Sequence, residues 1–172
     1  DAIRLPLIIY NVTKFTGVNI SFEAIAQLSE HPNIVGIKNS TANPDEFKQT
    51  IKNVSKDFTV LAGRGSVLLS ALKEGAKGVV LALANIAPVE CINIFNLFIN
   101  EKLSEAENLQ STLIPVNQAI TSTYGVAGLK AEIDMVGYYG GNPRLPLKAL
   151  DENKKNKLKQ ILTNASLIKQ RD

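Results

Sequence analysis

The sequence has one cysteine, one histidine and no tryptophan, and this scarcity excludes several kinds of site. A single cysteine cannot form an internal disulfide, which fits a reducing compartment. Cys91 and His31 alone cannot supply the usual histidine and cysteine ligands of a zinc site. Cys91 lies among apolar residues, which favours a core thiol over a nucleophile. His31 lies beside Pro32 at a predicted helix end, where capping or surface exposure is the simpler role.

Strong charge and long apolar runs are also missing. The net charge is +3, from 19 basic and 16 acidic residues, which is too small and too dispersed to indicate nucleic-acid binding. The densest basic run, Lys154–Lys159, falls on a predicted terminal helix and is expected to be a solvated face. No apolar run approaches the roughly 18 residues that span a bilayer. The hydrophobic fraction of 45% instead predicts a globular protein without a membrane partner.

Short apolar runs alternate with amphipathic segments over the first hundred residues. The runs predict four buried strands, at Leu5–Asn11, Asn33–Lys38, Phe58–Ala62 and Gly78–Leu83. Ser21 and Asn43 are predicted helix caps, with Phe22, Ile25 and Leu28 facing inward on the first helix. Strands that alternate with helices predict a parallel sheet covered on both faces.

After residue 100 the pattern is helical only. The predicted helices are Glu101–Thr123, with a possible bend at Pro115, Leu129–Val136 and Asp151–Lys169. Gly137–Arg144 is predicted to be an ordered turn between the last two helices. The chain begins at Asp1 without a methionine, and we expect it to begin partway through a longer protein.

Lys38 closes an apolar strand, an unusual place for a residue that is almost never fully buried unless it is paired. Desolvation would favour the neutral amine, which can attack a carbonyl and form a Schiff base. A simpler explanation is that the strand ends at Lys38 and the ammonium reaches water. The strand alone favours this simpler explanation.

Polar residues gather where the predicted strands end, and in parallel α/β proteins the carboxyl ends of strands hold the active site. Tyr10 and Lys38 would end adjacent strands, so the lysine could attack a ketone while the phenol transfers protons. Ser40 and the backbone of Gly63 could bind a carboxylate or hydroxyl. Tyr10 could equally be a core tyrosine. Gly63–Ser66 could bind an anion before a helix, although a simple tight turn is the more ordinary interpretation.

Several of these segments together resemble the dihydrodipicolinate synthase / N-acetylneuraminate lyase family of class I aldolases. The motifs that carry the resemblance are Tyr10-Asn11-Val12, Thr16-Gly17 and His31–Ser40. The segments Leu61–Gly63, Leu81–Asn85, Gly137–Gly141 and Arg144–Leu147 look most like the mitochondrial 4-hydroxy-2-oxoglutarate aldolase branch. The resemblance covers nearly the whole chain.

The resemblance implies a fold class for this chain. It is α/β: the C-terminal half, with four βα units, of a (β/α)8 TIM barrel, followed by a helical extension. Residues 1–100 would be the half-barrel, with strands matching the fifth to the eighth, and residues 101–172 the extension. Two open strand edges and an exposed barrel interior would follow.

The resemblance also assigns roles to four residues. Lys38 matches the Schiff-base lysine and Tyr10 the proton-transfer tyrosine, while Ser40 and Gly63 match substrate-binding positions. It implies no metal and no organic cofactor. Some residues depart from the family pattern: Thr13 stands where proline is usual, Asn39 where aspartate commonly follows the lysine, and Arg64 where the branch has a small residue.

The implied activity is a carbon–carbon lyase, with a small 2-oxo acid as substrate. The expected reaction is the cleavage of 4-hydroxy-2-oxoglutarate to pyruvate and glyoxylate, with the partial chain inactive by itself. One alternative is a dihydrodipicolinate synthase-type condensation of pyruvate with an aldehyde. Others are a truncated, non-catalytic paralogue that partners a full-length aldolase, and a phosphate-binding half-barrel. The resemblance further implies a homo-oligomer when full length and a mitochondrial location, with a cytoplasmic one as alternative.

Overall fold

The structure is a computed structural model that describes residues 4–41 and 43–169. The predicted start at Asp1 lies outside these residues. The chain divides into two compact units, Asp1–Leu81 and Ala82–Asp172, which are described separately. The division predicted at residue 100 is a different boundary, because it was expected to separate the last barrel helix from a helical extension. That division stays a prediction.

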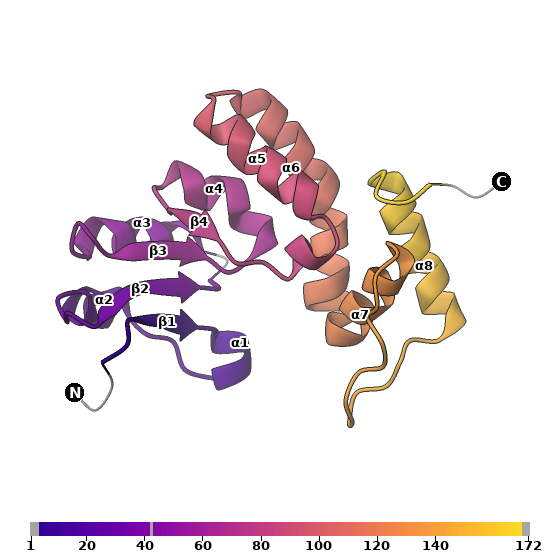
Figure 1. The fold of residues 1–172 in the computed structure, drawn as a ribbon, viewed down its shortest axis with the longest axis horizontal. Coiled ribbons are helices and arrows are strands. Elements are labelled where there is room, and N and C mark those ends of the chain that lie inside the picture. Colours follow the sequence, from indigo (N-terminus) through magenta and orange to yellow (C-terminus); the bar gives the residue numbers. More distant parts are fainter. Residues whose placement is uncertain (1–3, 42, 170–172) are drawn as a thin grey trace. The chain divides into compact units, whose positions relative to one another are not determined.

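The first unit contains a four-stranded parallel sheet, with the strands in chain order β1-β2-β3-β4 (Figure 1). The strands are β1 (Leu7–Asn11), β2 (Ile34–Asn39), β3 (Thr59–Ala62) and β4 (Gly78–Val79). The helices are α1 (Thr13–Thr16), α2 (Phe22–Ser29), α3 (Pro44–Asn53), η1 (Gly65–Val67) and α4 (Leu68–Lys73). The predicted alternation of strands with helices is confirmed.

The fourth strand is shorter than its apolar run. Val80 still donates a backbone hydrogen bond to Ala62 O at 2.9 Å, but the strand itself ends at Val79. Ala82 already has helical backbone angles and leads into the 3-10 turn η2 (Leu83–Asn85). The prediction of a strand through Leu83 was therefore wrong, because the end of this apolar run forms a turn.

Both predicted helix caps are present. The Ser21 side chain accepts a hydrogen bond from Ala24 N, and Asn43 accepts one from Asp45 N, with Pro44 at the first position of α3. The inward direction predicted for Leu28 was wrong, since 36% of Leu28 is exposed.

Ser29 is the buried residue at this end of α2. Its hydroxyl donates to Ala26 O at 2.7 Å and accepts from Ser55 N at 2.9 Å. Both polar functions of the Ser29 hydroxyl are therefore satisfied, which is why a serine is tolerated at this buried position.

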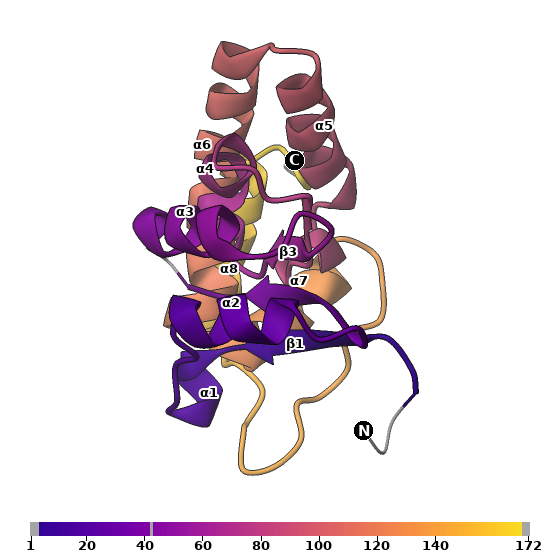
Figure 2. The ribbon, with the colours of Figure 1, turned by 90° about the vertical axis from the view of Figure 1, so that its left-hand side faces the viewer.

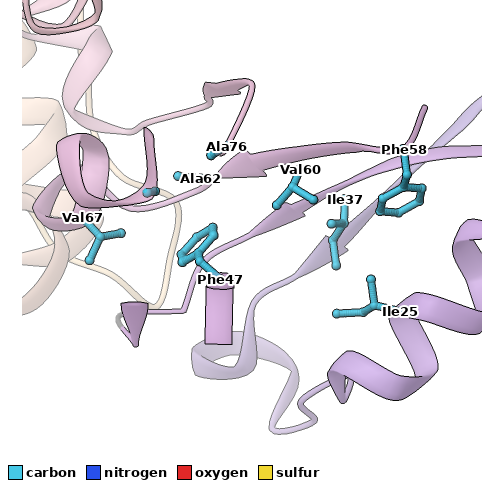
Figure 3. Close-up of a cluster of buried hydrophobic side chains, with 9 residues drawn as sticks. Ile25, Ile37, Phe47, Phe58, Val60, Ala62, Val67 and Ala76 are labelled. Atoms are coloured by element: carbon cyan, nitrogen blue, oxygen red, sulfur yellow. The ribbon is translucent and has the colours of Figure 1, made fainter. Parts of the chain in front are cut away.

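The core of the first unit lies between one face of the sheet and the helices. Figure 2 shows α2 and α3 side by side along the sheet, and Figure 3 shows the side chains that fill the space. The buried cluster consists of Ile25, Ile37, Phe47, Phe58, Val60, Ala62, Val67, Ala71 and Ala76. Full burial of one large apolar side chain contributes about 1.5–3 kcal/mol, so burial of this cluster stabilises the unit.

Strand β1 is at the edge of the sheet and is not buried as predicted. The exposed fractions are 54% for Ile8 and 50% for Tyr10, and Leu5 just before the strand is 71% exposed. The composition of this apolar run predicts a buried strand, but among the described residues β1 has only β2 as a neighbouring strand. This exposed edge agrees with the open strand edges expected of a half-barrel.

The second unit is helical. Its helices are α5 (Pro88–Ile99), α6 (Leu103–Gln118), the π-helical stretch η3 (Ala119–Thr123), α7 (Gly125–Met135) and α8 (Glu152–Asn164). Pro115 lies inside α6, and the wider π turn follows it, closed by Tyr124 N donating to Ala119 O at 2.8 Å. Over the part of the chain that the structure describes, no helix has the length and apolar character needed to cross a membrane.

Cys91 is buried in α5, which confirms a core thiol. Burial, with a smaller contribution from the negative charge of Glu90, raises the pKa of Cys91 to about 11. The thiolate, which is the reactive form, is therefore scarce near neutral pH.

Glu132 of α7 is the charged residue with the least favourable surroundings. Its exposed fraction is 0%, and neither carboxylate oxygen has a hydrogen-bond partner among the described residues. Burial raises the pKa of Glu132 from 4.5 to about 8. Folding therefore favours the protonated carboxyl, which removes the cost of a buried charge.

We expect the helical unit to lose stability as the pH rises from about 5 to about 8, because the folded state then holds a proton that the unfolded state has released. The steepest loss is about 1.4 kcal/mol per pH unit, and Glu132→Gln should abolish it. Chemical unfolding at several pH values measures this. Glu105→Gln, at an exposed position, is the matched control; parallel pH profiles for wild type and Glu132→Gln would contradict the prediction.

Candidate active site

Tyr10 and Lys38 are directly paired across the parallel strands β1 and β2. Paired residues point to the same face of a sheet, so the register brings their side chains together. The Lys38 Nζ lies 4.0 Å from the centroid of the Tyr10 ring. This is a cation–π contact, in which the ring face attracts positive charge. The structure therefore brings together the two residues predicted to be catalytic.

The carboxyl ends of β1, β2 and β3 are joined by backbone hydrogen bonds next to this pair. Ser40 N donates to Asn11 O at 3.0 Å, and Gly63 N donates to Asn39 O at 2.7 Å. The ladder thus continues one residue beyond the ends of β2 and β3. It brings Ser40 and Gly63 to the same edge as Lys38.

Gly63 is in such close contact with its neighbours that it leaves no room for a side chain. A Cβ at Gly63 would overlap the Ser40 Oγ and would lie 3.0 Å from the Lys38 Cε. The Ser40 hydroxyl donates to Gly63 O at 3.5 Å. Lys38, Tyr10, Ser40 and Gly63 therefore form one group, which we call the lysine cluster. Its geometry is observed, whereas the roles of the four residues remain predictions.

The turn that follows the lysine cluster is short. Arg64 leads into η1, and α4 after it has only six residues. This arrangement fits the simple tight turn that was weighed against an anion site at Gly63–Ser66. Within residues 4–41 and 43–169, no group of three or more histidine, cysteine, aspartate or glutamate residues could hold a metal ion.

Sequence reasoning missed the polar group on the other face of these strands. Asn11 and Asn39 are directly paired, with exposed fractions of 3% and 0%. Asn11 Nδ2 donates to Asn39 Oδ1 at 3.2 Å. The signal in the sequence was an asparagine directly after Tyr10 and another directly after Lys38.

His31 has a local structural role. Its Nδ1 accepts a hydrogen bond from Asn33 N at 3.1 Å, which holds the turn between α2 and β2. His31 thus lies at a helix end as expected, and its capping or surface role stays a prediction.

A separate hollow of about 470 Å³ lies in the helical unit. It is lined by charged, aromatic and small residues, among them Lys130, Asp134, Tyr139, Asn142 and Lys155. Its charged groups already hold the predicted turn at Gly137–Arg144. Lys130 Nζ donates to Gly140 O at 2.5 Å, and Gly140 N donates to Asp134 Oδ1 at 2.8 Å.

Four parallel strands alternating with helices, with a lysine–tyrosine pair at the carboxyl ends of two of them, define the first unit as a parallel α/β fold. A model of the Dihydrodipicolinate synthetase family matches residues 2–165, and the chain belongs to that family.

Individual relatives agree with the family. The chain is 35% identical over 169 residues to a 4-hydroxy-tetrahydrodipicolinate synthase of Thermodesulfovibrio yellowstonii, covering 98% of this chain and 58% of the relative. It is 31% identical to the enzyme of the same name from Archaeoglobus fulgidus, covering 96% and 57%.

Among solved structures, the chain is similar to a prophage protein of the dihydrodipicolinic acid synthase family from E. coli K12, solved in complex with pyruvate. The TM-score is 0.89 at 26% identity, covering 96% of this chain and 58% of that one. The parallel α/β fold thus matches that family, and the chain spans less than three-fifths of the length of these relatives.

Two finer expectations gain no support from these comparisons. The two sequence relatives are named as synthases, so they favour the synthase alternative over the 4-hydroxy-2-oxoglutarate branch. They come from a bacterium and an archaeon, which have no mitochondria, so they do not support the mitochondrial location that the branch implied.

The contact at Gly63 generates a prediction. Gly63→Ala should force apart Ser40 and Lys38 and lower the free energy of unfolding of the first unit by about 1–3 kcal/mol. Denaturant unfolding followed by circular dichroism measures this. Gly78→Ala is the control, because a Cβ there meets Leu61 Cδ2 at an ordinary 3.5 Å. Equal losses in both variants would show that the space beside Lys38 is not specially restricted.

Proposed function

We propose that this chain carries the Schiff-base half of an aldolase-type active site, in which Lys38 forms an imine with pyruvate or a related 2-oxo acid. One observation carries the proposal: the Lys38 Nζ lies 4.0 Å from the Tyr10 ring centroid, at the strand ends where Ser40 and Gly63 meet. The family membership of the chain supports it. So does the related structure solved in complex with pyruvate.

The lysine cluster suits the chemical steps of such a reaction. The neutral amine of Lys38 adds to the ketone carbon, and loss of water gives a protonated imine. The Tyr10 hydroxyl is the candidate proton donor and acceptor for the carbinolamine oxygen. The face of the same ring attracts the positive charge that nitrogen carries both in the free ammonium and in the iminium.

The iminium explains why no metal or organic cofactor is required in this proposal. It withdraws electrons from the neighbouring carbon, which loses a proton and becomes an enamine nucleophile. The enamine can then form a carbon–carbon bond with an aldehyde, and the reverse sequence cleaves that bond. Ser40 Oγ and the backbone at Gly63 are candidate hydrogen-bond partners for the oxygens of the bound acid.

Between the two directions of the reaction, we favour condensation with an aldehyde, as in the synthases that the chain resembles. Cleavage of 4-hydroxy-2-oxoglutarate is the second candidate, supported by the segments at Gly137–Gly141 and Arg144–Leu147. The glycine at position 140 of the first of these segments also has a local structural reason, because a Cβ there would overlap Lys130 O.

The chain spans 57–58% of the length of these two relatives, and the rest of their length has no counterpart in it. We therefore propose that it forms the imine but does not turn over by itself. Imine formation also distinguishes the proposal from the non-catalytic alternative, in which the lysine cluster would be present but would not react with a 2-oxo acid.

We expect pyruvate and borohydride together to add one reduced pyruvyl group to the chain, at Lys38, because the imine is reduced to a stable amine. Intact-mass and peptide mass spectrometry measure the adduct. Lys38→Arg is the matched control, since it keeps the charge above Tyr10 but cannot form an imine. Tyr10→Phe should still form the adduct, about 10²-fold more slowly or slower, because it loses the proton-transfer group.

A folded sample that gains no adduct, or gains it equally in Lys38→Arg, would reject Lys38 as the Schiff-base residue in this chain. Labelling spread evenly over many lysines would mean ordinary surface reactivity. A circular dichroism spectrum of each sample establishes that it is folded.

The two reaction directions predict different second adducts. Adding an aldehyde to the pyruvate reaction before borohydride should increase the adduct mass by the mass of the aldehyde that the site accepts. A synthase-type site should accept a four-carbon amino aldehyde, which together with pyruvate supplies the seven carbons of the dipicolinate skeleton. A cleavage-type site should accept glyoxylate, and that outcome would reject the synthase direction.

A further inference from the structure

Five residues near the ends of β1 and β2 are joined in a closed ring of hydrogen bonds, in which Thr41 takes part through both its backbone N–H and its hydroxyl. Asn11 Nδ2 donates to Asn39 Oδ1 at 3.2 Å and to Asn19 Oδ1 at 2.8 Å. Thr41 N donates to Asn39 Oδ1 at 3.1 Å, and Thr41 Oγ1 donates to Glu46 Oε2 at 2.6 Å. Asn19 Nδ2 closes the ring by donating to Glu46 Oε1 at 3.5 Å. We call Asn11, Asn19, Asn39, Thr41 and Glu46 the amide ring.

The amide ring connects segments at the ends of β1 and β2, and its asparagines Asn11 and Asn39 lie on the face of the sheet opposite to Tyr10 and Lys38. Asn11 ends β1, Asn19 lies in the loop after it, Asn39 ends β2, Thr41 follows it, and Glu46 is in the first turn of α3. A second bond, from Ile20 N to Asn11 Oδ1 at 3.3 Å, also ties the loop after β1 to this ring. The ring is thus a lateral tie between two strand ends.

The position of the ring relative to the lysine cluster follows from the strand geometry. Successive side chains of a strand point to opposite faces. Tyr10 and Lys38 are paired on one face, and the next residues, Asn11 and Asn39, are paired on the other. Asn11 and Asn39 are therefore each joined by one peptide bond to a residue of the lysine–tyrosine pair.

Burial gives the tie its strength. Asn11 and Asn39 are 3% and 0% exposed, so water does not compete for their hydrogen bonds. The Asn39 Nδ2 has no partner among the described residues, which is an unfavourable arrangement for a buried amide. The Asn39 Oδ1, by contrast, is fully used, because it accepts hydrogen bonds from both Asn11 Nδ2 and Thr41 N.

The backbone alone holds β1 weakly. It has five residues, it pairs only with β2 among the described strands, and its register with β2 is irregular between Leu7 and Ile8. An edge strand with one ladder can shift or fray at its end more easily than a central strand. The amide ring adds constraints at that end, one residue away from Tyr10.

We propose that Asn39, with Asn11 and Glu46, is a positioning residue that holds Tyr10 over the Lys38 ammonium. The effect of this positioning role on reactivity rests on the proposed function, whereas its effect on the Tyr10–Lys38 geometry does not. Without the amide ring, the ends of β1 and β2 separate or slide, and the aromatic side chain of Tyr10 moves away from Lys38. Imine formation then slows while the core of the unit stays folded.

Nuclear magnetic resonance measures the geometry directly, with no substrate. A methylene group close to an aromatic face is shifted upfield, so the ε-methylene of Lys38 should resonate upfield of the exposed lysines, assigned by its loss in Lys38→Arg. Asn39→Ala should lose most of that upfield shift. Asn39→Asp keeps an oxygen for Asn11 and Thr41 and should retain it.

The matched control is Asn53→Ala, which removes an exposed asparagine of α3 whose Nδ2 donates only to Gln49 O at 2.7 Å. It should leave the Lys38 signal in place. Thr41→Val, which opens the amide ring at one link, provides a second variant if Asn39→Ala does not fold, and it should show a smaller loss in the same direction. Backbone signals of Ile37 and Val60 report whether the core is intact.

A folded Asn39→Ala or Thr41→Val variant whose Lys38 signal is unchanged would overturn the proposal. Pyruvate trapping with borohydride provides the second readout: Asn39→Ala should slow adduct formation at least about tenfold, while Asn39→Asp and Asn53→Ala react at the wild-type rate. If wild type forms no adduct, the proposed function fails, and the Lys38 signal still decides the positioning role. Equal adduct rates in wild type and Asn39→Ala would also reject the positioning role.

Discussion

The parallel ladder between β1 and β2 is the interaction on which the described site depends. It pairs Tyr10 with Lys38 on one face and Asn11 with Asn39 on the other, so a single register sets both contacts. Because the side-chain period of a strand is two, a slip by one residue would exchange these faces. The asparagines would then meet the exposed face, and the lysine would enter the core.

The two faces of the first unit have different physical roles. The face covered by α2, α3 and α4 holds the apolar cluster shown in Figure 3, and that burial stabilises the unit. The other face carries Ile8 and Tyr10, both about half exposed. The apolar core and the Tyr10–Lys38 pair thus lie on opposite sides of the same strands.

Much of the fold was predictable because it depends on local signals. The alternation of apolar runs with capped helices, Ser21 and Asn43 included, predicted the parallel sheet. The environment of β1 and the length of β4 were not predictable in this way, since both depend on which segments lie beside them. The pairing of Tyr10 with Lys38 followed from their places at strand ends, but the amide ring did not. Its bonds join residues up to 28 positions apart, and asparagine in a sequence indicates loops and caps as often as buried networks.

The lysine cluster and the amide ring share the two strand ends of one βαβ unit, and nearly all of their residues lie between Tyr10 and Glu46; only Gly63 comes from the next strand. This compactness has a consequence for how the group tolerates change. The contacts around Lys38 depend on one short stretch of the chain and on Gly63, so substitutions elsewhere touch none of them directly.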